Sequence, residues 1–321
     1  MLIATAALTA LRVSATRAQK SAAVARVGLL WITAGGDSTF VTAFRDGMQA
    51  RGYADGRNVR IDAQALVERY DRLPEAAEQL VRQNVDVIVS YGATATLAAH
   101  RATSSVPIVM VTGADPVKVG LVASLAKPGG NVTGVTFLHP QLDAKRLELL
   151  QEAVPRIRRV GLLLNPASAT EPANVPRWQA AAERLKVDVQ AIEIRLQSDI
   201  DPVIDGLAQS GLDAIAVVGG TMFVANRTEI VAAIARTRLP AVFGSADYPD
   251  VGGLMSYGPN VSDGFRQAAG LVVKILKGTK PSDIPFEQAS KFELVVNART
   301  AKALAMTMPA SILLRADRVI N

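Results

Sequence analysis

The sequence predicts an α/β protein of two similar lobes, each a doubly wound parallel sheet, joined by a hinge that the chain crosses several times. The stretch Arg-Val-Gly-Leu-Leu at residues 26–30 recurs at residues 159–163, and an apolar landmark at residues 86–110 recurs less closely at residues 213–243. The offset of about 130 residues is too long for a solenoid repeat and suits a duplicated domain. Composition agrees, because an apolar share of 49% with only 5% aromatics requires an aliphatic core, as in parallel sheets.

The elements of the first copy follow from hydrophobic spacing and turn residues. Apolar runs of strand length end in turn residues, and segments with helical spacing begin there. Gly52 stops the first helix, and Pro74 stands early in the second. We expect strands at residues 26–32, 58–62, 85–90, 108–111 and 132–137. We expect helices at residues 40–51, from 73 onward, at 94–101 and at 118–125.

The second copy shows the same alternation, which predicts a parallel sheet with helices on both faces. We expect strands at residues 160–164, 188–194, 214–218, 241–243 and 292–297. We expect helices at residues 142–153, 178–185, from 201 onward, and at 227–237, 265–276 and 300–305. The first lobe is therefore assigned residues 25–137 and 253–288, and the second lobe residues 138–252 and 289–321. The hinge crossings are expected near residues 137–138, 252–257 and 286–292.

Residues 1–24 differ from the rest and predict a secretory signal. Leu2 to Leu11 is an apolar run of suitable length, and Thr16-Arg-Ala18 resembles a small-x-small cleavage site. No basic residue precedes the run, so a misplaced start or a short cytosolic helix is the alternative. No other apolar run approaches 18 residues, and none is expected to span a membrane. The chain would then lie in the periplasm, without a lipid anchor, because it has no Cys to acylate.

The remaining composition excludes several function classes. The formal net charge is +6, but Lys and Arg are scattered, which favours a solvated surface over nucleic-acid binding. The only two histidines, His100 and His139, lack metal-ligand spacing. The chain has neither a G-x-x-x-x-G-K-[ST] loop nor a G-x-S-x-G elbow, and Gly35-Gly36 lacks the spacing of a dinucleotide fingerprint. We therefore predict binding rather than catalysis, with no metal and no cofactor.

The candidate site follows from a rule for open parallel sheets, in which ligands bind beyond the carboxyl ends of the strands. The rule selects three loops in each copy, and these loops offer backbone amides and hydroxyls. The candidate ligand-binding residues are Gly36, Asp37, Ser38, Tyr91, Gly92, Ala93, Thr94, Thr112, Gly113, Asp115, Phe137, Asn165, Gly220, Thr221 and Asp247.

The turn Tyr91–Thr96 is the sharpest of these candidates. Gly92 lets the backbone turn after a strand, and the next helix has free N–H groups at Ala93, Thr94 and Ala95. These amides and the helix dipole favour an anion, most simply a carboxylate. A plain N-cap that serves only the helix is the alternative.

Asp115 and Asp247 are candidate acceptors for an ammonium group of the ligand. Asp115 could instead cap the following helix, and Asp247 could be a surface turn residue. Phe137 is one of several aromatic residues near strand ends, where core packing is the alternative to ligand contact.

Ten ordered segments, spread from about Arg26 to the C-terminus, are specific enough to compare with a known family: Tyr70–Pro74, Asp86–Val89, Asp115–Val117, Gly120–Leu125, Lys127–Gly134, Lys145–Leu150, Gly252–Asn260, Lys274–Gly278, Lys291–Val295 and Thr300–Leu304. Together they resemble the substrate-binding proteins of ABC importers, in the family with a type I periplasmic-binding fold that includes tryptophan- and tyrosine-binding members.

The resemblance implies a periplasmic receptor, expected to be a monomer, that closes on a small carboxylate-bearing solute and delivers it to ABC transporter permease subunits. It also implies that the helix start at Ala93–Thr94 binds the carboxylate. The chain departs from the family at Gly219–Met222, where many relatives have an Asp-Pro pair, and at Gly244–Asp247, where many have bulkier residues. Because these loops help to set the solute, an amino acid and an aromatic or branched carboxylate are both compatible with the sequence.

Two other functions are compatible with such a fold. The effector-binding domain of a transcription regulator would need a DNA-binding segment before Arg26, where the sequence has an apolar Ala-rich stretch. A cleft enzyme acting on a small carboxylate would have to use carboxylates as its reactive groups.

Overall fold

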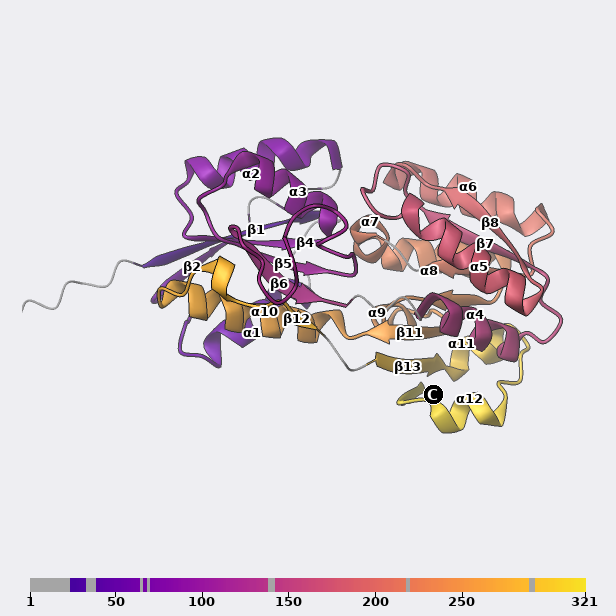
Figure 1. The fold of residues 1–321 in the computed structure, drawn as a ribbon. Helices are drawn as coiled ribbons and strands as arrows, with labels where there is room; N and C mark the ends of the chain where they lie inside the picture. The colour runs from indigo at the N-terminus through magenta and orange to yellow at the C-terminus, as the bar shows by residue number, and fades with distance from the viewer. Residues whose placement is uncertain are drawn as a thin grey trace, which may run out of the picture.

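The computed structural model describes residues 24–32, 39–63, 66–67, 70–137, 142–217, 220–288 and 292–321. Figure 1 shows two lobes side by side, the first mostly indigo to magenta and the second mostly red to yellow. The expected signal segment and the candidates Gly36, Asp37 and Ser38 lie outside the described residues. No helix in the described part of the chain has the length and apolar character needed to cross a membrane.

The first lobe is built on a fully parallel sheet with the strand order β12-β6-β5-β4-β1-β2, and β3 also pairs with β1. Every residue of β4, β5 and β6 is buried, as expected of aliphatic strands covered on both faces. The strands are β1 (Ala25–Ile32), β2 (Val59–Asp62), β3 (Leu66–Val67), β4 (Val87–Tyr91), β5 (Ile108–Thr112), β6 (Val132–Thr136) and β12 (Glu287–Gln288). The helices are α1 (Thr39–Gln49), α2 (Leu73–Arg82), α3 (Ala93–Ala102) and α10 (Val261–Leu276), with short 3-10 turns η1 (Tyr70–Arg72) and η5 (Pro281–Asp283).

The second lobe repeats this plan with the strand order β8-β7-β9-β10-β11-β13-β14, in which only the β11–β13 pair is antiparallel. The strands are β7 (Arg159–Leu164), β8 (Asp188–Glu193), β9 (Ala214–Val217), β10 (Ala241–Phe243), β11 (Met255–Pro259), β13 (Phe292–Asn297) and β14 (Arg318–Ile320). The helices are α4 (Leu142–Ala153), α5 (Val175–Leu185), α6 (Ile200–Gly206), α7 (Thr221–Ala225), α8 (Arg227–Thr237), α9 (Asp247–Asp250), α11 (Ala298–Ala303) and α12 (Ala310–Arg315), with 3-10 turns at Pro172–Asn174, Gln197–Asp199 and Leu207–Gln209. In both sheets the second strand along the chain lies outside the first, so the predicted α/β fold with two doubly wound lobes is confirmed.

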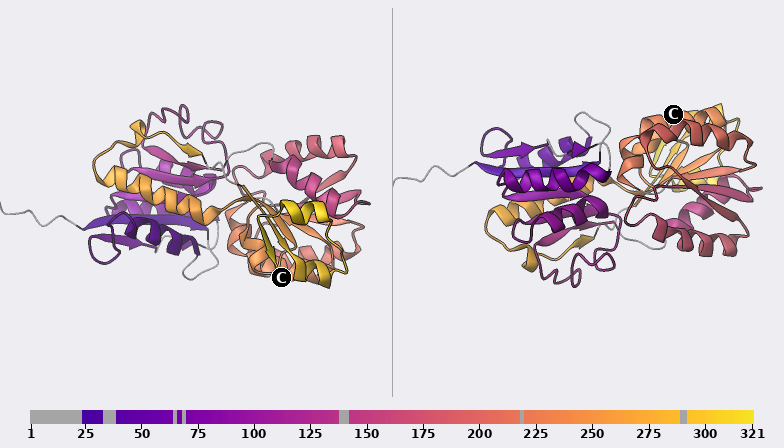
Figure 2. Two further views of the ribbon diagram at one scale, coloured as in Figure 1. Left: turned by 90° about the horizontal axis from the view of Figure 1, so that it is seen from below. Right: turned by 90° about the horizontal axis from the view of Figure 1, so that it is seen from above.

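The predicted lobe boundary at residue 253 is wrong. β11 pairs with β10 and β13, so residues 255–259 belong to the second sheet. The chain returns to the first lobe only after Pro259, where α10 packs along α1; both views of Figure 2 show this orange helix in the first lobe. The second crossing therefore lies around Asn260 rather than at residues 252–257.

The helix predicted at residues 118–125 is also absent. This segment forms consecutive turns, and Gly120 has a φ of +75°, which a right-handed helix cannot contain. Asp115 starts the turns, because its Oδ1 accepts hydrogen bonds from the amides of Val117 and Lys118 at 3.0 and 3.3 Å. Asp115 therefore caps a turn and not the helix that the sequence predicted.

An aromatic cluster fixes the cleft-facing end of the first sheet. The Phe265 ring on α10 lies 5.2 Å from Trp31, 5.2 Å from Phe40 and 5.5 Å from Tyr91, measured between ring centroids. Trp31, Phe40 and Phe265 are buried and pack together in the core of the first lobe. The same packing holds the Tyr91 ring at the end of β4, directly before α3.

Candidate functional site

A cleft of about 490 Å³ lies between the carboxyl ends of the two sheets. Its size is typical of a small-molecule site. Ten of the candidate residues line it: Tyr91, Gly92, Ala93, Thr94, Thr112, Gly113, Asp115, Phe137, Gly220 and Thr221. Ser168, Ser245 and Tyr248, from the strand-end loops that the sequence selected in the second copy, also line it. Seven further lining residues were missed by the sequence analysis: Tyr70, Lys118, Asp143, Arg146, Glu171, Asn174 and Arg177.

The start of α3 opens into this cleft. Gly92, its N-cap residue, has φ +84° and ψ 155°, a conformation that strongly favours glycine, and no side chain caps the helix. The first amides of a helix have no acceptor within it, so those of Ala93 and Thr94 are available at the cleft wall. Thr96, the other threonine of this turn, is buried and bonds to Ser90 and to the Gly92 carbonyl, each at 2.9 Å. Of the two threonines, only Thr94 therefore lines the cleft.

The two lobes touch beside this helix start. The Ala169 amide of the second lobe donates to Thr94 Oγ1 of the first lobe at 3.1 Å, and Tyr70 Oη lies 3.2 Å from Thr221 Oγ1 across the same boundary. A Cβ added to Gly92 would stand 2.8 Å from the Thr221 methyl group. The two lobes are therefore in direct contact beside the start of α3.

Glu171 is an acidic residue that lines the cleft and is only 4% exposed. Its Oε2 accepts a 2.7 Å hydrogen bond from the Asn165 amide, whereas Oε1 has no hydrogen-bond partner among the described residues. Burial raises the pKa of this carboxyl to about 7, although the Asn165 amide and the Ser168 hydroxyl act in the opposite direction. Gly220 leaves room for it, because a Cβ at that position would collide with Oε1.

Tyr70 of the first lobe and Tyr248 of the second lobe line the same cleft as Glu171. Burial, and next the charge of Glu171, raise the pKa of the Tyr70 hydroxyl well above its usual value. Burial is also the largest cause that raises the Tyr248 pKa, with Tyr91, Asp247 and Glu171 adding to it. Tyr248 is 1% exposed, and its hydroxyl lacks a hydrogen-bond partner within the described ranges.

Two candidates do not line the cleft. Asn165 is fully buried and organises its own loop: its Nδ2 donates to the Arg195 carbonyl at 3.0 Å, and its Oδ1 accepts from the Ala167 amide at 2.8 Å. Asp247 begins α9 and accepts a short hydrogen bond from the Ser245 hydroxyl. Because Asp247 turns back to its own loop, it does not present its carboxylate to the cleft as the sequence analysis expected.

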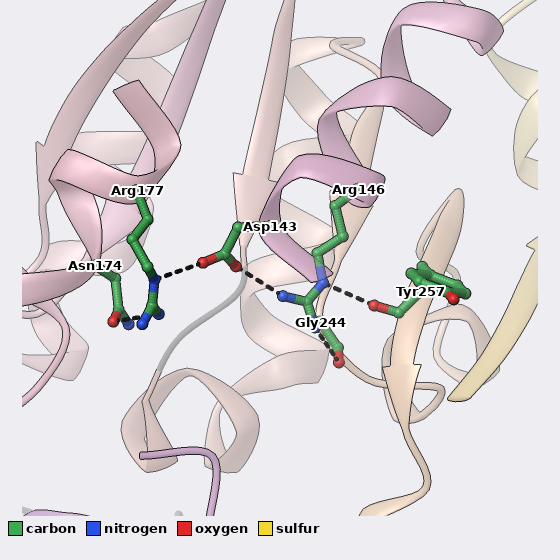
Figure 3. Close-up of polar contacts among 6 residues, drawn as sticks. All are labelled: Asp143, Arg146, Asn174, Arg177, Gly244 and Tyr257. Carbon is green, nitrogen blue, oxygen red and sulfur yellow. Dashed lines mark hydrogen bonds and ion pairs between the residues drawn. The ribbon is translucent and has the colours of Figure 1, made fainter. Parts of the chain in front are cut away.

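A buried charge network forms the second lobe's side of the cleft (Figure 3). Arg146 Nε donates to the Tyr257 carbonyl at 2.7 Å, and its Nη1 donates to Asp143 Oδ1 at 3.0 Å. Arg177 Nε donates to the other Asp143 oxygen at 3.2 Å, and its Nη2 donates to Asn174 at 2.7 Å. Desolvation lowers the pKa of Arg146, and Asp143 opposes that shift. Both oxygens of Asp143 are thus already used by the protein.

The sequence held a weak signal for this network. Asp143 and Arg146 stand three residues apart in an expected helix, which puts them on one face of it beside apolar residues. Glu171 had no such signal, because it lies seven positions after the last residue of β7. Among the described residues, no group of three His, Asp or Glu could hold a metal ion.

Comparisons with known proteins agree with this architecture. The model of a family described as ABC transporter substrate binding protein matches residues 31–320. A tyrosine-binding protein of Clostridioides difficile (strain R20291) is 28% identical over 267 residues, which are 83% of this chain and 75% of that protein.

Two solved structures match nearly the whole chain. An ABC domain from Streptococcus pneumoniae in complex with L-Trp is 27% identical, with a TM-score of 0.82 and coverage of 92% of this chain and 99% of that chain. A conserved domain protein from Vibrio cholerae is 26% identical, with a TM-score of 0.83 and the same coverage. The two-lobed architecture is therefore common to these proteins and this chain.

Proposed function

The chain belongs to the family of ABC transporter substrate-binding proteins, and we propose that it is the periplasmic receptor of an importer. It binds a small carboxylate-bearing solute between two closing lobes and delivers the solute to the permease subunits. The observation that carries this proposal is the uncapped start of α3, which opens into an interlobe cleft of about 490 Å³.

The α3 start supports a carboxylate as the group held by the first lobe. The amides of Ala93 and Thr94 and the positive end of the helix dipole stabilise an anion without a dedicated cation. Gly113 adds space, because nothing lies within 4 Å of a Cβ built on it. The carboxylate would thus lie against backbone amides and the Thr94 side of the cleft.

The interlobe hydrogen bonds support closure as the mechanism. A solute that contacts both lobes stabilises the closed state by its higher affinity for that state. The Thr94–Ala169 and Tyr70–Thr221 contacts form only when the lobes meet. Capture is then a conformational equilibrium that the solute shifts, without any covalent step, and a single chain is sufficient for it.

The relatives support an amino acid or an aromatic carboxylate as the solute. One relative is described as a tyrosine-binding protein and another was solved with L-Trp. In this chain the cleft presents the aromatic side chains of Tyr91, Phe137 and Tyr248. A flat or branched apolar group would pack against these rings, while its carboxylate faces α3.

Calorimetric titration of the purified full chain tests the proposal. The probes are L-tyrosine, L-tryptophan and L-leucine, their deaminated acids, and the methyl ester of each. At least one free acid is expected to bind with a Kd near 1 μM, about −8 kcal/mol, and its ester to bind at least about 100-fold more weakly, because the ester carries no anion for α3.

Native mass spectrometry of the freshly purified protein provides the complementary measurement, because it detects a solute retained from the cell. Equal affinity for a free acid and its ester would contradict the carboxylate site. An absence of binding by every free acid, together with no retained carboxylate, would contradict the proposed function itself.

A further inference from the structure

We propose that Glu171 selects solutes that carry an ammonium group next to their carboxylate, so that the cleft recognises an α-amino acid and rejects the corresponding deaminated acid. The inference rests on the proposed function and adds a second charged group to the carboxylate assigned there. It assigns to Glu171 the acceptor role that the sequence suggested for Asp115 or Asp247.

The other acidic residues of the cleft already have partners. Both Asp143 oxygens accept hydrogen bonds from Arg146 and Arg177. Asp115 uses Oδ1 to hold a turn and is partly exposed to solvent. Of the acids that line the cleft within the described residues, only Glu171 has a buried oxygen without a hydrogen-bond partner.

Among the described residues, no ion pair joins Glu171 to a cationic side chain. The carboxyl accepts a hydrogen bond from the Asn165 amide and lies against Gly220, with the neutral Ser168 hydroxyl nearby. An ionised carboxylate in such surroundings costs free energy until a cation joins it. A bound ammonium group supplies that cation.

A second unpartnered group points to the same place. Tyr248 also lines the cleft, and its hydroxyl is buried and has no hydrogen-bond partner in the described part of the chain. An ammonium group has three donors, so it can bind the Glu171 carboxylate and a hydroxyl oxygen together. Buried polar atoms are normally paired in folded proteins, and two unpaired atoms in one cleft indicate that a ligand completes them.

The positions also match the two charges of an α-amino acid. Thr221 connects them: its hydroxyl meets Tyr70 beside Glu171, and its methyl group lies against Gly92 at the start of α3. The anion-binding amides and the unpaired carboxyl therefore lie on either side of one threonine. In an α-amino acid, the ammonium and carboxylate groups are likewise close together, because one carbon atom carries both.

Calorimetry with pairs of ligands that differ only in the ammonium group tests this inference. The pairs are L-tyrosine with 3-(4-hydroxyphenyl)propanoate, L-tryptophan with 3-(indol-3-yl)propanoate, and L-leucine with 4-methylpentanoate. For the pair that binds the wild-type protein, we expect the amino acid to bind about 10- to 150-fold more tightly, the range of a hydrogen bond to a charged group. Glu171→Gln should reduce this preference to below about tenfold, and Glu171→Asp should restore part of it.

Glu183→Gln is the matched control, since it makes the same change at an exposed residue of α5 that does not line the cleft. This variant should keep the wild-type preference. If the wild-type protein binds a deaminated acid as tightly as its amino acid, or Glu171→Gln keeps the full preference, the inference is wrong while the proposed function stands. If no member of any pair binds, native mass spectrometry decides: a retained carboxylate without an amino group contradicts the inference alone, and no retained carboxylate contradicts the proposed function and the inference with it. The wild-type comparison remains decisive if Glu171→Gln does not fold.

Discussion

Glu171 imposes opposite demands on folding and on binding. Its carboxyl is buried beside Gly220 with one unpaired oxygen, an arrangement that costs stability when the group is charged. The same lack of a partner leaves the carboxyl available to a ligand. Binding sites commonly retain such locally unfavourable groups because they serve function.

The pKa of Glu171 gives this cost a definite pH dependence. Burial raises the pKa from 4.5 to about 7 in the folded chain, so the folded state binds the proton more tightly than the unfolded state does. The contribution of Glu171 to the free energy of unfolding is therefore greatest below about pH 4.5. This contribution falls by up to about 3 kcal/mol as the pH rises from there through 7. The groups that face the carboxyl, Tyr70 and Tyr248, stay neutral over this range because their pKa values are raised.

Urea unfolding of the solute-free protein at pH 4 and pH 8 measures this effect. At pH 8 we expect Glu171→Gln to be more stable than wild type, by up to about 3 kcal/mol, and at pH 4 nearly equal to it. A Glu171→Gln variant that is equally destabilised at both pH values would show that the carboxyl is not strained by its charge.

The sequence identified part of the site at the residue scale, and the reason is geometric. Tyr91, Gly92 and Thr94 follow directly after a strand, so the strand-end rule finds them. Glu171 and Tyr70 reach the cleft through irregular segments, whose path no periodic pattern encodes. Asp247 shows the converse failure: it follows a strand closely, but its carboxylate bonds to Ser245 in its own loop.

At the scale of elements, Arg146 connects three pieces of the second lobe next to the hinge. It stands on α4, just after the first crossing, and it donates to the carbonyls of Tyr257 on β11 and Gly244 after β10, at 2.7 and 3.4 Å. β11 ends where the second crossing begins. Arg146 therefore connects α4 to the end of β11 and to the segment after β10.

Arg146→Met should destabilise the protein strongly, because it leaves a buried Asp143 with a single exposed partner. We expect a loss of about 3 kcal/mol or more in the free energy of unfolding, measured with urea. Arg177→Met is the matched control, since it removes the other partner of Asp143 from a side chain that is 41% exposed; its expected cost is about 0–1 kcal/mol. Similar losses in the two variants would show that burial does not govern this network.

The elements themselves were largely predictable, but their assignment to lobes was not. Residues 252–257 were expected to form a hinge crossing, yet residues 255–259 form a strand of the second sheet by pairing with β13, some 40 residues away along the chain. Apolar spacing specifies a strand but not its neighbour. The turns at residues 118–125 were misread for a related reason: their apolar residues follow a helical spacing that Gly120 prevents from forming.

For the whole molecule, the duplicated strand order places two equivalent sheet edges face to face. In each lobe the strand order reverses beside the first strand, the position where open α/β sheets bind ligands. The copies have diverged at this edge: α3 has ten residues, whereas the equivalent α7 has five and is followed at once by α8. One lobe thus offers the longer helix for an anion, and the other offers the Glu171 side of the cleft.

Close approach of the lobes depends on Gly92, and Gly92→Ala tests closure directly. A Cβ at this position would lie 2.8 Å from Thr221 across the lobe boundary, so the variant cannot reach the same closed state without moving Thr221. In wild type, a saturating amino acid should reduce the radius of gyration in small-angle X-ray scattering. In Gly92→Ala we expect this reduction to be smaller and the affinity to fall at least about tenfold, or 1.4 kcal/mol.

The control for this prediction separates backbone strain from the clash between lobes. Gly56 has φ +79°, close to the +84° of Gly92, but nothing lies within 4 Å of a Cβ built on it. Gly56→Ala should therefore cost stability, as a residue with positive φ does, while affinity and solute-induced compaction stay at wild-type values. Gly92→Ala should differ from it in both binding and compaction. If the two variants behave alike, or if Gly92→Ala still compacts fully with solute, closure does not bring Gly92 against Thr221 and the lobes meet elsewhere.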